Sequence, residues 1–298
     1  MKQFIPFILI ILVSLTVART GEARQSIFVS ILPQKYMVER IGKNKVHVNV
    51  IVAPGANPHT YEPKPAQMAI LSKAQLYFSI GVPFENFWLD KIAAANPKMK
   101  IIHTDEGIHK LPMTAYHKDK HHTSESYHDE HSSHGHAGMD PHIWTSPILV
   151  KQQAETICKA LSKEDPSNAA FYASNLNAFI WEIQDLDQQL HDLFQDKPGT
   201  RFMAFHPAWG YFARDYGLEM IPIEMEGKDP KPAQLMRLIK HARAYGIRVI
   251  FVQPQFSSKS AALIAREIKG RVVAADPLAY QWMDNLKTIA AQFKGALK

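Results

Sequence analysis

The chain has 298 residues, of which 46% are hydrophobic and 21% are charged, and these are the proportions of a globular protein. This length is sufficient for two units of ordinary domain size. The formal net charge is +6, but the lysines and arginines are scattered along the chain and form no stripe, which argues against a nucleic-acid partner. We therefore expect a soluble, basic, monomeric protein that binds no DNA or other nucleic acid.

The N-terminus is typical of a secretory signal peptide. Lys2 precedes an apolar run at 4–17 that is short for a membrane span, and small residues occupy the −3 and −1 positions of a cleavage site after Ala23. The single cysteine, Cys158, lies far from this region, so we expect no lipid anchor and no internal disulfide. We predict that residues 1–23 are removed on export to the periplasm, with an uncleaved membrane anchor as the alternative, and that Cys158 is a small core residue.

Past residue 23, β-branched runs alternate with segments of helical periodicity. We predict strands at 27–32, 46–52, 76–80 and 101–102, and helices at 65–74 and 84–94. The alternation stops at about residue 109 and resumes near residue 140, where Ser146 is placed to cap a helix that starts near Pro147. This order predicts a mainly parallel sheet with helices on both faces.

A second series with the same alternation begins near residue 201. We predict strands at 202–205, 220–223, 249–252 and 272–275, and helices at 207–216, 230–244, 258–268 and 281–296. Asp229 is the predicted cap of the helix that ends near Ala244, with Pro230 at its first position. The second series therefore predicts another parallel sheet covered by helices.

Residues 165–196 separate the two series and contain no proline or glycine after Pro166. Apolar residues recur there at helical spacing, and a helix of about 28 residues would be about 42 Å long. We predict an α/β fold of two lobes with mainly parallel sheets flanked by helices. Residues 24–164 form the N-terminal lobe, one long rigid helix at 165–196 joins the lobes and limits their movement, and residues 197–298 form the C-terminal lobe.

Three histidines and one aspartate lie in strand-to-helix junctions, each beside a proline. They are His59, His142, His206 and Asp276. In open α/β sheets, ligands bind outside the carboxyl ends of the strands, so two facing sheets would bring these four residues together in the cleft between the lobes. Neutral imidazole and carboxylate groups are ligands of zinc. The sequence therefore predicts a four-coordinate zinc site in the cleft.

A second group of histidines lies between two of these junctions. It comprises His117, His121, His122, His128, His131, His134 and His136. They alternate with charged residues and serines and have almost no apolar neighbours, so we predict a loop at about 109–139 that is disordered without metal. We expect these histidines to bind metal weakly, as a collector, a chaperone or a sensor of metal level. The alternative is a tolerated surface insertion.

Five motifs together resemble those of the metal-binding receptors of bacterial ABC-type zinc and manganese importers. They are PGANPHTYEP at 54–63, DPHIW at 140–144, FHPAW at 205–209, QPQFS at 253–257 and DPL at 276–278. The resemblance covers essentially the whole chain past residue 23. It implies two α/β lobes joined by one long helix, a metal ion buried between them, and delivery of that ion to a membrane permease. It carries the ligand roles onto His59, His142, His206 and Asp276.

Within this family, zinc receptors tend to have histidine at the third ligand position, where manganese and iron receptors tend to have glutamate. His206 and the His-rich stretch, which many zinc receptors share, therefore favour Zn²⁺ as the transported ion over Mn²⁺ or iron. Two departures concern Pro58, which stands where some zinc receptors have an acidic residue, and Cys158, which cannot form the disulfide that some carry. These departures leave the fourth ligand open between Asp276 and a water molecule.

Two alternatives come from other functional classes. A zinc hydrolase also suits three histidines and a carboxylate, but catalytic zinc normally keeps an open position. The sequence also has no His-Glu-x-x-His helix and no Gly-x-Ser-x-Gly elbow. A metal-dependent adhesin would act at a cell surface, which the expected lack of a lipid anchor disfavours. We therefore expect a periplasmic solute-binding protein that is not an enzyme and that supplies zinc to an ABC-type permease.

Overall fold

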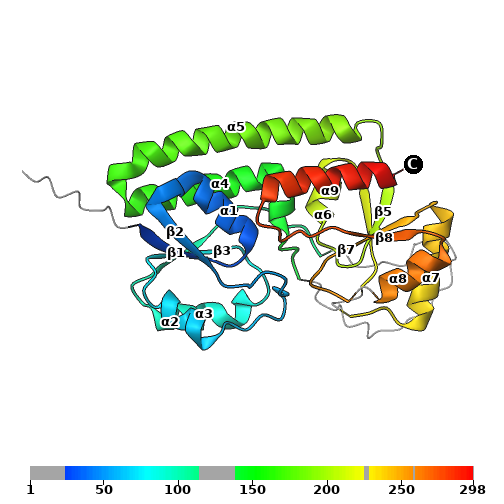
Figure 1. Ribbon diagram of the computed structural model, residues 1–298, viewed down its shortest axis with the longest axis horizontal. Coiled ribbons are helices and arrows are strands. Elements are labelled where there is room, and N and C mark those ends of the chain that lie inside the picture. The colour runs from blue at the N-terminus through cyan, green and yellow to red at the C-terminus, as the bar shows by residue number, and fades with distance from the viewer. Residues whose placement is uncertain (1–23, 114–137, 225–227, 258, 298) are drawn as a thin grey trace, which may run out of the picture.

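The computed structural model describes residues 24–113, 138–224, 228–257 and 259–297, which form two lobes side by side (Figure 1). The predicted signal peptide at 1–23 and the seven clustered histidines from His117 to His136 lie outside these ranges, so the statements about them stay predictions. None of the described helices is both long and apolar enough to cross a membrane.

The first lobe is built on a parallel sheet with the strand order β2-β1-β3-β4. Its strands are β1 (Gln25–Val29), β2 (Val46–Val50), β3 (Leu76–Ser79) and β4 (Lys100–His103). Its helices are α1 (Leu32–Gly42), α2 (Pro65–Leu71), α3 (Glu85–Ala95) and α4 (Pro147–Glu164). Helices α1 and α4 lie on one side of the sheet, and α2 and α3 lie on the other (Figure 1). All residues of the central strand β3 are buried, as expected for a sheet covered on both faces.

The second lobe repeats this arrangement with the strand order β6-β5-β7-β8, again all parallel. Its strands are β5 (Arg201–Ala204), β6 (Glu219–Pro222), β7 (Val249–Val252) and β8 (Arg271–Ala274). Its helices are α6 (Gly210–Asp215), α7 (Pro232–Ala244), α8 (Lys259–Glu267) and α9 (Trp282–Ala296). Helices α7 and α8 enclose a separate apolar cluster on one face of the sheet, and α6 and α9 cover the other face. The two lobes therefore share one topology.

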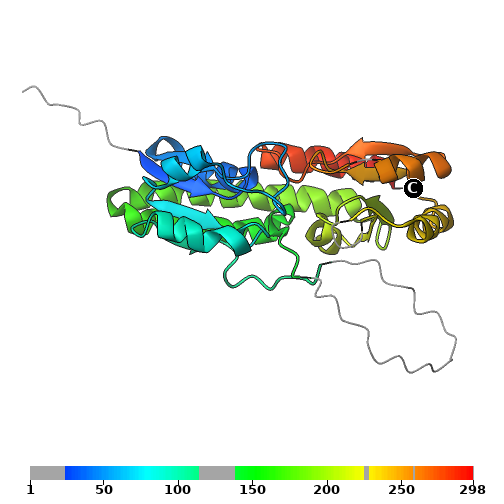
Figure 2. The same cartoon turned by 90° about the horizontal axis from the view of Figure 1, so that it is seen from below.

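Helix α5 (Ala169–Phe194) runs along both lobes (Figures 1 and 2). Its 26 residues make a rod about 39 Å long. Its buried face packs against α1 and α4 in the first lobe and against α9 in the second. The side chains of this face belong to a single apolar core that continues from the first sheet to the second. Because a close-packed core resists deformation, this core favours the expected limit on lobe movement.

The lobes also meet directly at Trp144 and Trp282. The indole N–H of Trp144 donates to the carbonyl of Pro277 at 2.7 Å, and the indole N–H of Trp282 donates to the carbonyl of Trp144 at 2.7 Å. Both rings are buried. Trp144 is two residues from His142, and Pro277 follows Asp276, so this contact fixes the segments of two predicted ligands relative to each other.

One helix starts later than predicted. Helix α7 begins at Pro232 with Lys231 as its cap, so the prediction of Asp229 as the cap and Pro230 as the first residue is wrong. Proline disfavours a helical conformation of the residue before it. Lys231, which precedes Pro232, is accordingly extended, so the helix starts only at Pro232. The backbone N–H of Lys231 donates to the side chain of Gln234 at 2.7 Å instead.

Other differences are also local. A 3₁₀ turn, Pro166–Asn168, precedes α5, because the Asp165 carboxylate accepts hydrogen bonds from the side chains of Ser167 and Asn168, which compete with helical ones. Helix α1 was not predicted. The base of the predicted loop at 109–139 is ordered, since an antiparallel bridge pairs Pro112 with Met139. Cys158 is buried on α4, as expected.

Candidate metal centre

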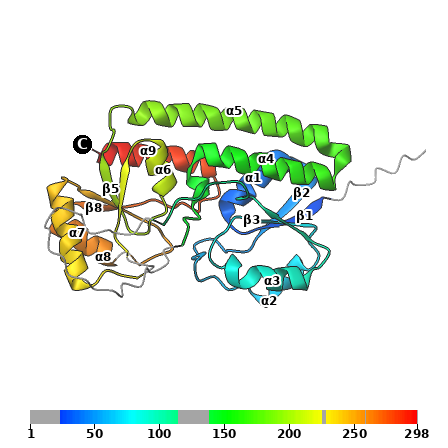
Figure 3. The same cartoon turned by 180° about the vertical axis from the view of Figure 1, so that it is seen from behind.

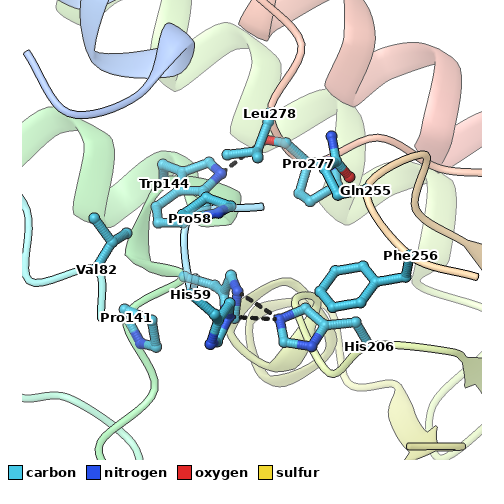
Figure 4. Close-up of a pocket in the computed structure, with 11 residues that line it drawn as sticks. Pro58, His59, Val82, Pro141, Trp144, His206, Gln255, Phe256, Pro277 and Leu278 are labelled. Atoms are coloured by element: carbon cyan, nitrogen blue, oxygen red, sulfur yellow. Dashed lines mark hydrogen bonds between the residues drawn. The ribbon is translucent and has the colours of Figure 1, made fainter. Parts of the chain in front are cut away.

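Three imidazole rings converge between the lobes (Figure 4). The Nε2 atom of His206 is 3.1 Å from that of His59 and 3.1 Å from that of His142. Among the described residues, these three form the one group of three or more His, Cys, Asp or Glu side chains placed to share a metal ion. The structure therefore brings together the three histidines that the sequence analysis selected from three distant segments.

His59 reaches the site from the loop between β2 and α2. The Asn57 side chain accepts the backbone N–H of His59 at 2.9 Å, and the carbonyl of Pro58 accepts the backbone N–H of Phe84 at 3.1 Å. The Gln67 side chain donates to the carbonyl of Ile51 at the other end of the loop, at 2.6 Å. Hydrogen bonds and prolines thus shape this loop, but no hydrogen bond between described residues holds the Nδ1 atom of His59, and its ring is half-buried.

His142 is held by Asp140. One carboxylate oxygen of Asp140 accepts both the backbone N–H of His142 at 2.9 Å and its ring Nδ1–H at 2.7 Å. The backbone of Asp140 is fixed in turn, because its carbonyl accepts the hydroxyl of Tyr211, from the second lobe, at 2.8 Å. Ser146 accepts the backbone N–H of Leu149 at 3.3 Å and caps α4 as predicted. The ring of His142 is therefore buried and oriented.

His206 follows β5 and is held by two side chains that lie just past the neighbouring strands β7 and β6. The Gln253 side chain accepts the backbone N–H of His206 at 3.1 Å and donates to its carbonyl at 2.8 Å. One oxygen of Glu224 accepts the ring Nδ1–H at 2.8 Å. Glu224 lies just past β6, whose residue Pro222 pairs with Ala204, so the parallel register places it beside His206.

Asp140 and Glu224 determine which ring nitrogen of His142 and of His206 carries the proton and which has a free lone pair. A carboxylate only accepts hydrogen bonds, so Nδ1 of His142 and Nδ1 of His206 carry the protons and each Nε2 presents a lone pair when the ring is neutral. Two lone pairs 3.1 Å apart repel unless one of the rings takes up a proton or a metal ion binds both nitrogens. In a tetrahedral zinc site with Zn–N bonds of 2.0–2.1 Å, ligand nitrogens are about 3.3 Å apart, so the spacing fits a shared zinc ion.

Burial keeps the rings in the neutral form that a metal requires. It lowers the pKa of His59 to about 3, with a further contribution from the nearby His206 and His142 rings. Burial also lowers the pKa of His206, although the hydrogen bond to Glu224 opposes this shift. Because a protonated imidazole cannot bind a metal ion, the folded chain holds these two rings ready for a metal ion at neutral pH.

The space at the centre is small. Its cavity of about 10 Å³ has room for one particle of the size of a water molecule. The ring of Phe256 stacks on that of His206 with a centroid distance of 4.4 Å, and Val82 and Trp144 also line the cavity (Figure 4). Such a cavity suits a single small ion.

Asp276 does not join the three histidines in the group placed to share a metal ion. Its Oδ1 atom accepts the side-chain amide of Gln255 at 2.8 Å and the backbone N–H of Leu278 at 2.9 Å. Gln255 and Leu278 themselves line the cavity. Asp276 therefore lies next to the site, with one oxygen used to shape its wall.

Sequence reasoning missed the roles of Asp140, Glu224 and Gln253. Asp140 and Gln253 belong to motifs that were noticed, but only as parts of a resemblance. Glu224 follows β6 by two residues, as His206 follows β5, but only the pairing of these two strands brings Glu224 beside His206. One oxygen of Asp140 and one of Glu224 are buried without a hydrogen-bond partner among the described residues, so both carboxylates remain available to a nearby positive charge.

Two α/β lobes with a cluster of three histidines between them are the architecture of a metal-binding receptor. The family model described as "ZnuA: Zinc-uptake complex component A periplasmic" matches residues 27–296. The chain therefore belongs to this family of periplasmic zinc-uptake components.

Individual relatives agree with this assignment. The high-affinity zinc uptake system protein ZnuA of Bacillus subtilis is 28% identical over 250 residues, which cover 83% of this chain and 76% of the relative. A crystal structure of ZnuA is 43% identical with a TM-score of 0.83 and covers 92% of this chain and 99% of its own. A ZnuA deletion mutant with zinc bound is 43% identical with a TM-score of 0.82 and covers 92% and 98%.

Proposed function

We propose that this chain captures Zn²⁺ in the periplasm with the Nε2 atoms of His59, His142 and His206 and delivers it to the membrane permease of an ABC importer. The observation that carries the site is the convergence of three Nε2 atoms, two of them on rings whose Nδ1 atoms are held by carboxylates. Family membership supports the role in zinc uptake. The fourth position is left to Asp276 or to a water molecule.

The choice of zinc follows from the ligand chemistry as well as from the family. Three imidazoles favour Zn²⁺ over Mn²⁺, both in the intrinsic affinity order and in ligand softness. A competition titration on a variant that lacks residues 117–136 should show one tight site with preference for zinc. His206→Glu adds a hard oxygen ligand and should narrow the preference. Wild-type chain that bound Mn²⁺ as tightly as Zn²⁺ would contradict the proposal.

The seven histidines from His117 to His136 are proposed to bind further zinc weakly. Their density allows coordination, while the entropy of ordering a polar segment opposes tight binding. The residues that flank this segment are close together, because the backbone N–H of Met113 donates a hydrogen bond to the carbonyl of Gly138 at 3.0 Å. A deletion between them therefore need not disturb the lobes. Deleting 117–136 should lower the zinc stoichiometry and keep the tight site. Loss of the tight site would contradict this assignment.

Two smaller parts of the proposal concern catalysis and assembly. The family consists of uptake receptors, and we propose binding and delivery without an enzymatic step. The chain is expected to act as a monomer, which sedimentation of the zinc-loaded protein would check. A stable dimer under those conditions would contradict this expectation.

A further inference from the structure

The two lobes carry nearly the same surface segment at equivalent places. Residues 62–71 read EPKPAQMAIL in the first lobe, and residues 229–238 read DPKPAQLMRL in the second. The first segment follows the edge strand β2 and contains α2, and the second follows the edge strand β6 and contains the start of α7. We call them the paired segments.

The paired segments also have the same conformation. Lys64 has φ −75° and ψ 150°, and Lys231 has φ −67° and ψ 159°. The N–H of each lysine donates to the side chain of the glutamine three residues later, at 2.9 Å for Gln67 and 2.7 Å for Gln234. In both segments the acidic residue, the lysine, the second proline and the alanine are exposed, and the final leucine is buried.

Folding accounts for only some of the residues that the paired segments share. The second proline and the glutamine start the helix, and the leucine packs in the core, but the acidic residue, the lysine and the alanine face solvent. Another pair of equivalent helices, α3 and α8, reads ENFWLDKIAAA and KSAALIARE and shows no such likeness. Likeness at exposed positions, which the paired segments show and α3 and α8 do not, indicates a contact that is made twice.

An exposed apolar side chain accompanies each segment. Ile70 is 52% exposed and Met236 is 67% exposed. They lie one position apart when the two segments are aligned, and methionine is among the residues enriched at protein interfaces. Helices α2 and α7 both lie on the side of the molecule away from α5, one in each lobe (Figures 1 and 3). The first segment begins three residues after His59, and the second begins five residues after Glu224, so both adjoin the metal centre in sequence.

We propose that the paired segments dock onto a membrane permease built from two copies of one subunit, each copy contacting one lobe. Two-fold symmetry is the commonest symmetry of oligomers, and it offers the same surface twice. Each copy would present an acidic group to Lys64 or Lys231 and an apolar patch to Ile70 or Met236. The identity of the partner rests on the proposed function.

The test reverses the two lysines in the full chain, in cells that keep the native permease. Lys64→Glu and Lys231→Glu should each lower the initial rate of zinc uptake at limiting zinc by a similar factor, at least about tenfold, because like charges at an interface repel strongly. The double variant should lower it further. Matched controls are Lys159→Glu on α4 and Lys287→Glu on α9, two exposed lysines whose reversal should leave uptake unchanged.

Zinc titration of the purified variants separates this proposal from the proposed function. All variants should bind zinc as the wild type does, since none of these lysines lines the metal cavity. Normal zinc binding with normal uptake in the double variant would overturn the docking surface alone. An effect of only one of the two lysines would also overturn it, because the contact would not be symmetric. A wild-type chain that bound no zinc would instead overturn the proposed function.

Discussion

The second lobe supports its one metal-facing histidine more firmly than the first lobe supports His59. His206 has its backbone paired twice with Gln253 and its ring backed by Glu224, whereas the ring of His59 is half-buried on a loop. His142 resembles His206 rather than its neighbour in the first lobe, because Asp140 orients its ring. Each lobe therefore contributes one carboxylate-backed histidine, and a less supported third histidine completes the site.

The two outer carboxylates would allow the proposed site to hold a doubly charged ion without a carboxylate ligand. When ionised, Asp140 and Glu224 carry two negative charges one imidazole away from the centre, which balance the charge of Zn²⁺. Outer carboxylates of this kind also raise the basicity of the histidines that they contact. Charge balance at the proposed site would therefore not require Asp276 as a ligand, and we propose that a water molecule can take the fourth position instead.

The largest effect should come from removing a carboxylate-backed histidine. In the variant without 117–136, His142→Ala or His206→Ala should weaken zinc binding by more than the 10–100-fold that the loss of an outer partner causes, because each removes a direct bond and strands a buried carboxylate. His59→Ala should weaken it less, since water can reach the position of a half-buried ring. Competition with a zinc chelator measures the zinc affinity of all three variants. Equal losses of affinity would show that His59 is as important as the two carboxylate-backed histidines.

Removing the carboxylates tests the comparison directly. Asp140→Asn and Glu224→Gln keep the size of each side chain but remove its charge, and each should weaken zinc binding about 10–100-fold. Asn57→Ala is the matched control for His59, because Asn57 holds only the backbone of that residue and its loss should matter less. Wild-type affinity in both carboxylate variants would show that orientation and charge at His142 and His206 have no influence.

Asp276→Asn should have a smaller effect on zinc affinity than Glu224→Gln. The asparagine keeps an oxygen that can accept the bonds from Gln255 and from the Leu278 backbone, so the wall of the cavity is preserved. If Asp276 were a direct ligand, this substitution would instead weaken binding as strongly as the loss of His59. Isothermal titration of the two variants side by side decides between these outcomes.

The smallest effect concerns the stability of the metal-free protein against pH. The pKa of His59 is lowered to about 3 in the folded chain, whereas an unfolded histidine binds a proton at about pH 6.5. Protons therefore favour the unfolded chain as pH falls from about 6.5 towards 3, and the melting temperature should decrease over this window. His59→Gln should reduce that decrease, and His47→Gln, at an exposed position on β2, should not. The same slope in both variants would contradict this assignment.

The sequence predicted the two parallel sheets and the three histidines because both depend on local order. Strand ends of parallel sheets meet at one edge, so His59, which follows β2, and His206, which follows β5, could be placed in one cleft without knowing a single contact. His142 was selected for the same cleft, but it directly precedes a 3₁₀ turn and α4 and does not end a strand of the sheet. Glu224 escaped because its role depends on the pairing of β5 with β6, which no local pattern reveals. The start of α7 was misplaced because two prolines, Pro230 and Pro232, both satisfied the rule for a first helical residue, and only the second does so in the structure.

The most direct test of the metal centre is anomalous diffraction at the zinc edge from crystals of the zinc-loaded chain. One peak should lie between the lobes, about 2.0–2.1 Å from Nε2 of His59, of His142 and of His206, with Asp140 and Glu224 still bonded to the far nitrogens of their rings. A tight-site peak at any other set of residues, or one that omits His142 or His206, would contradict the account.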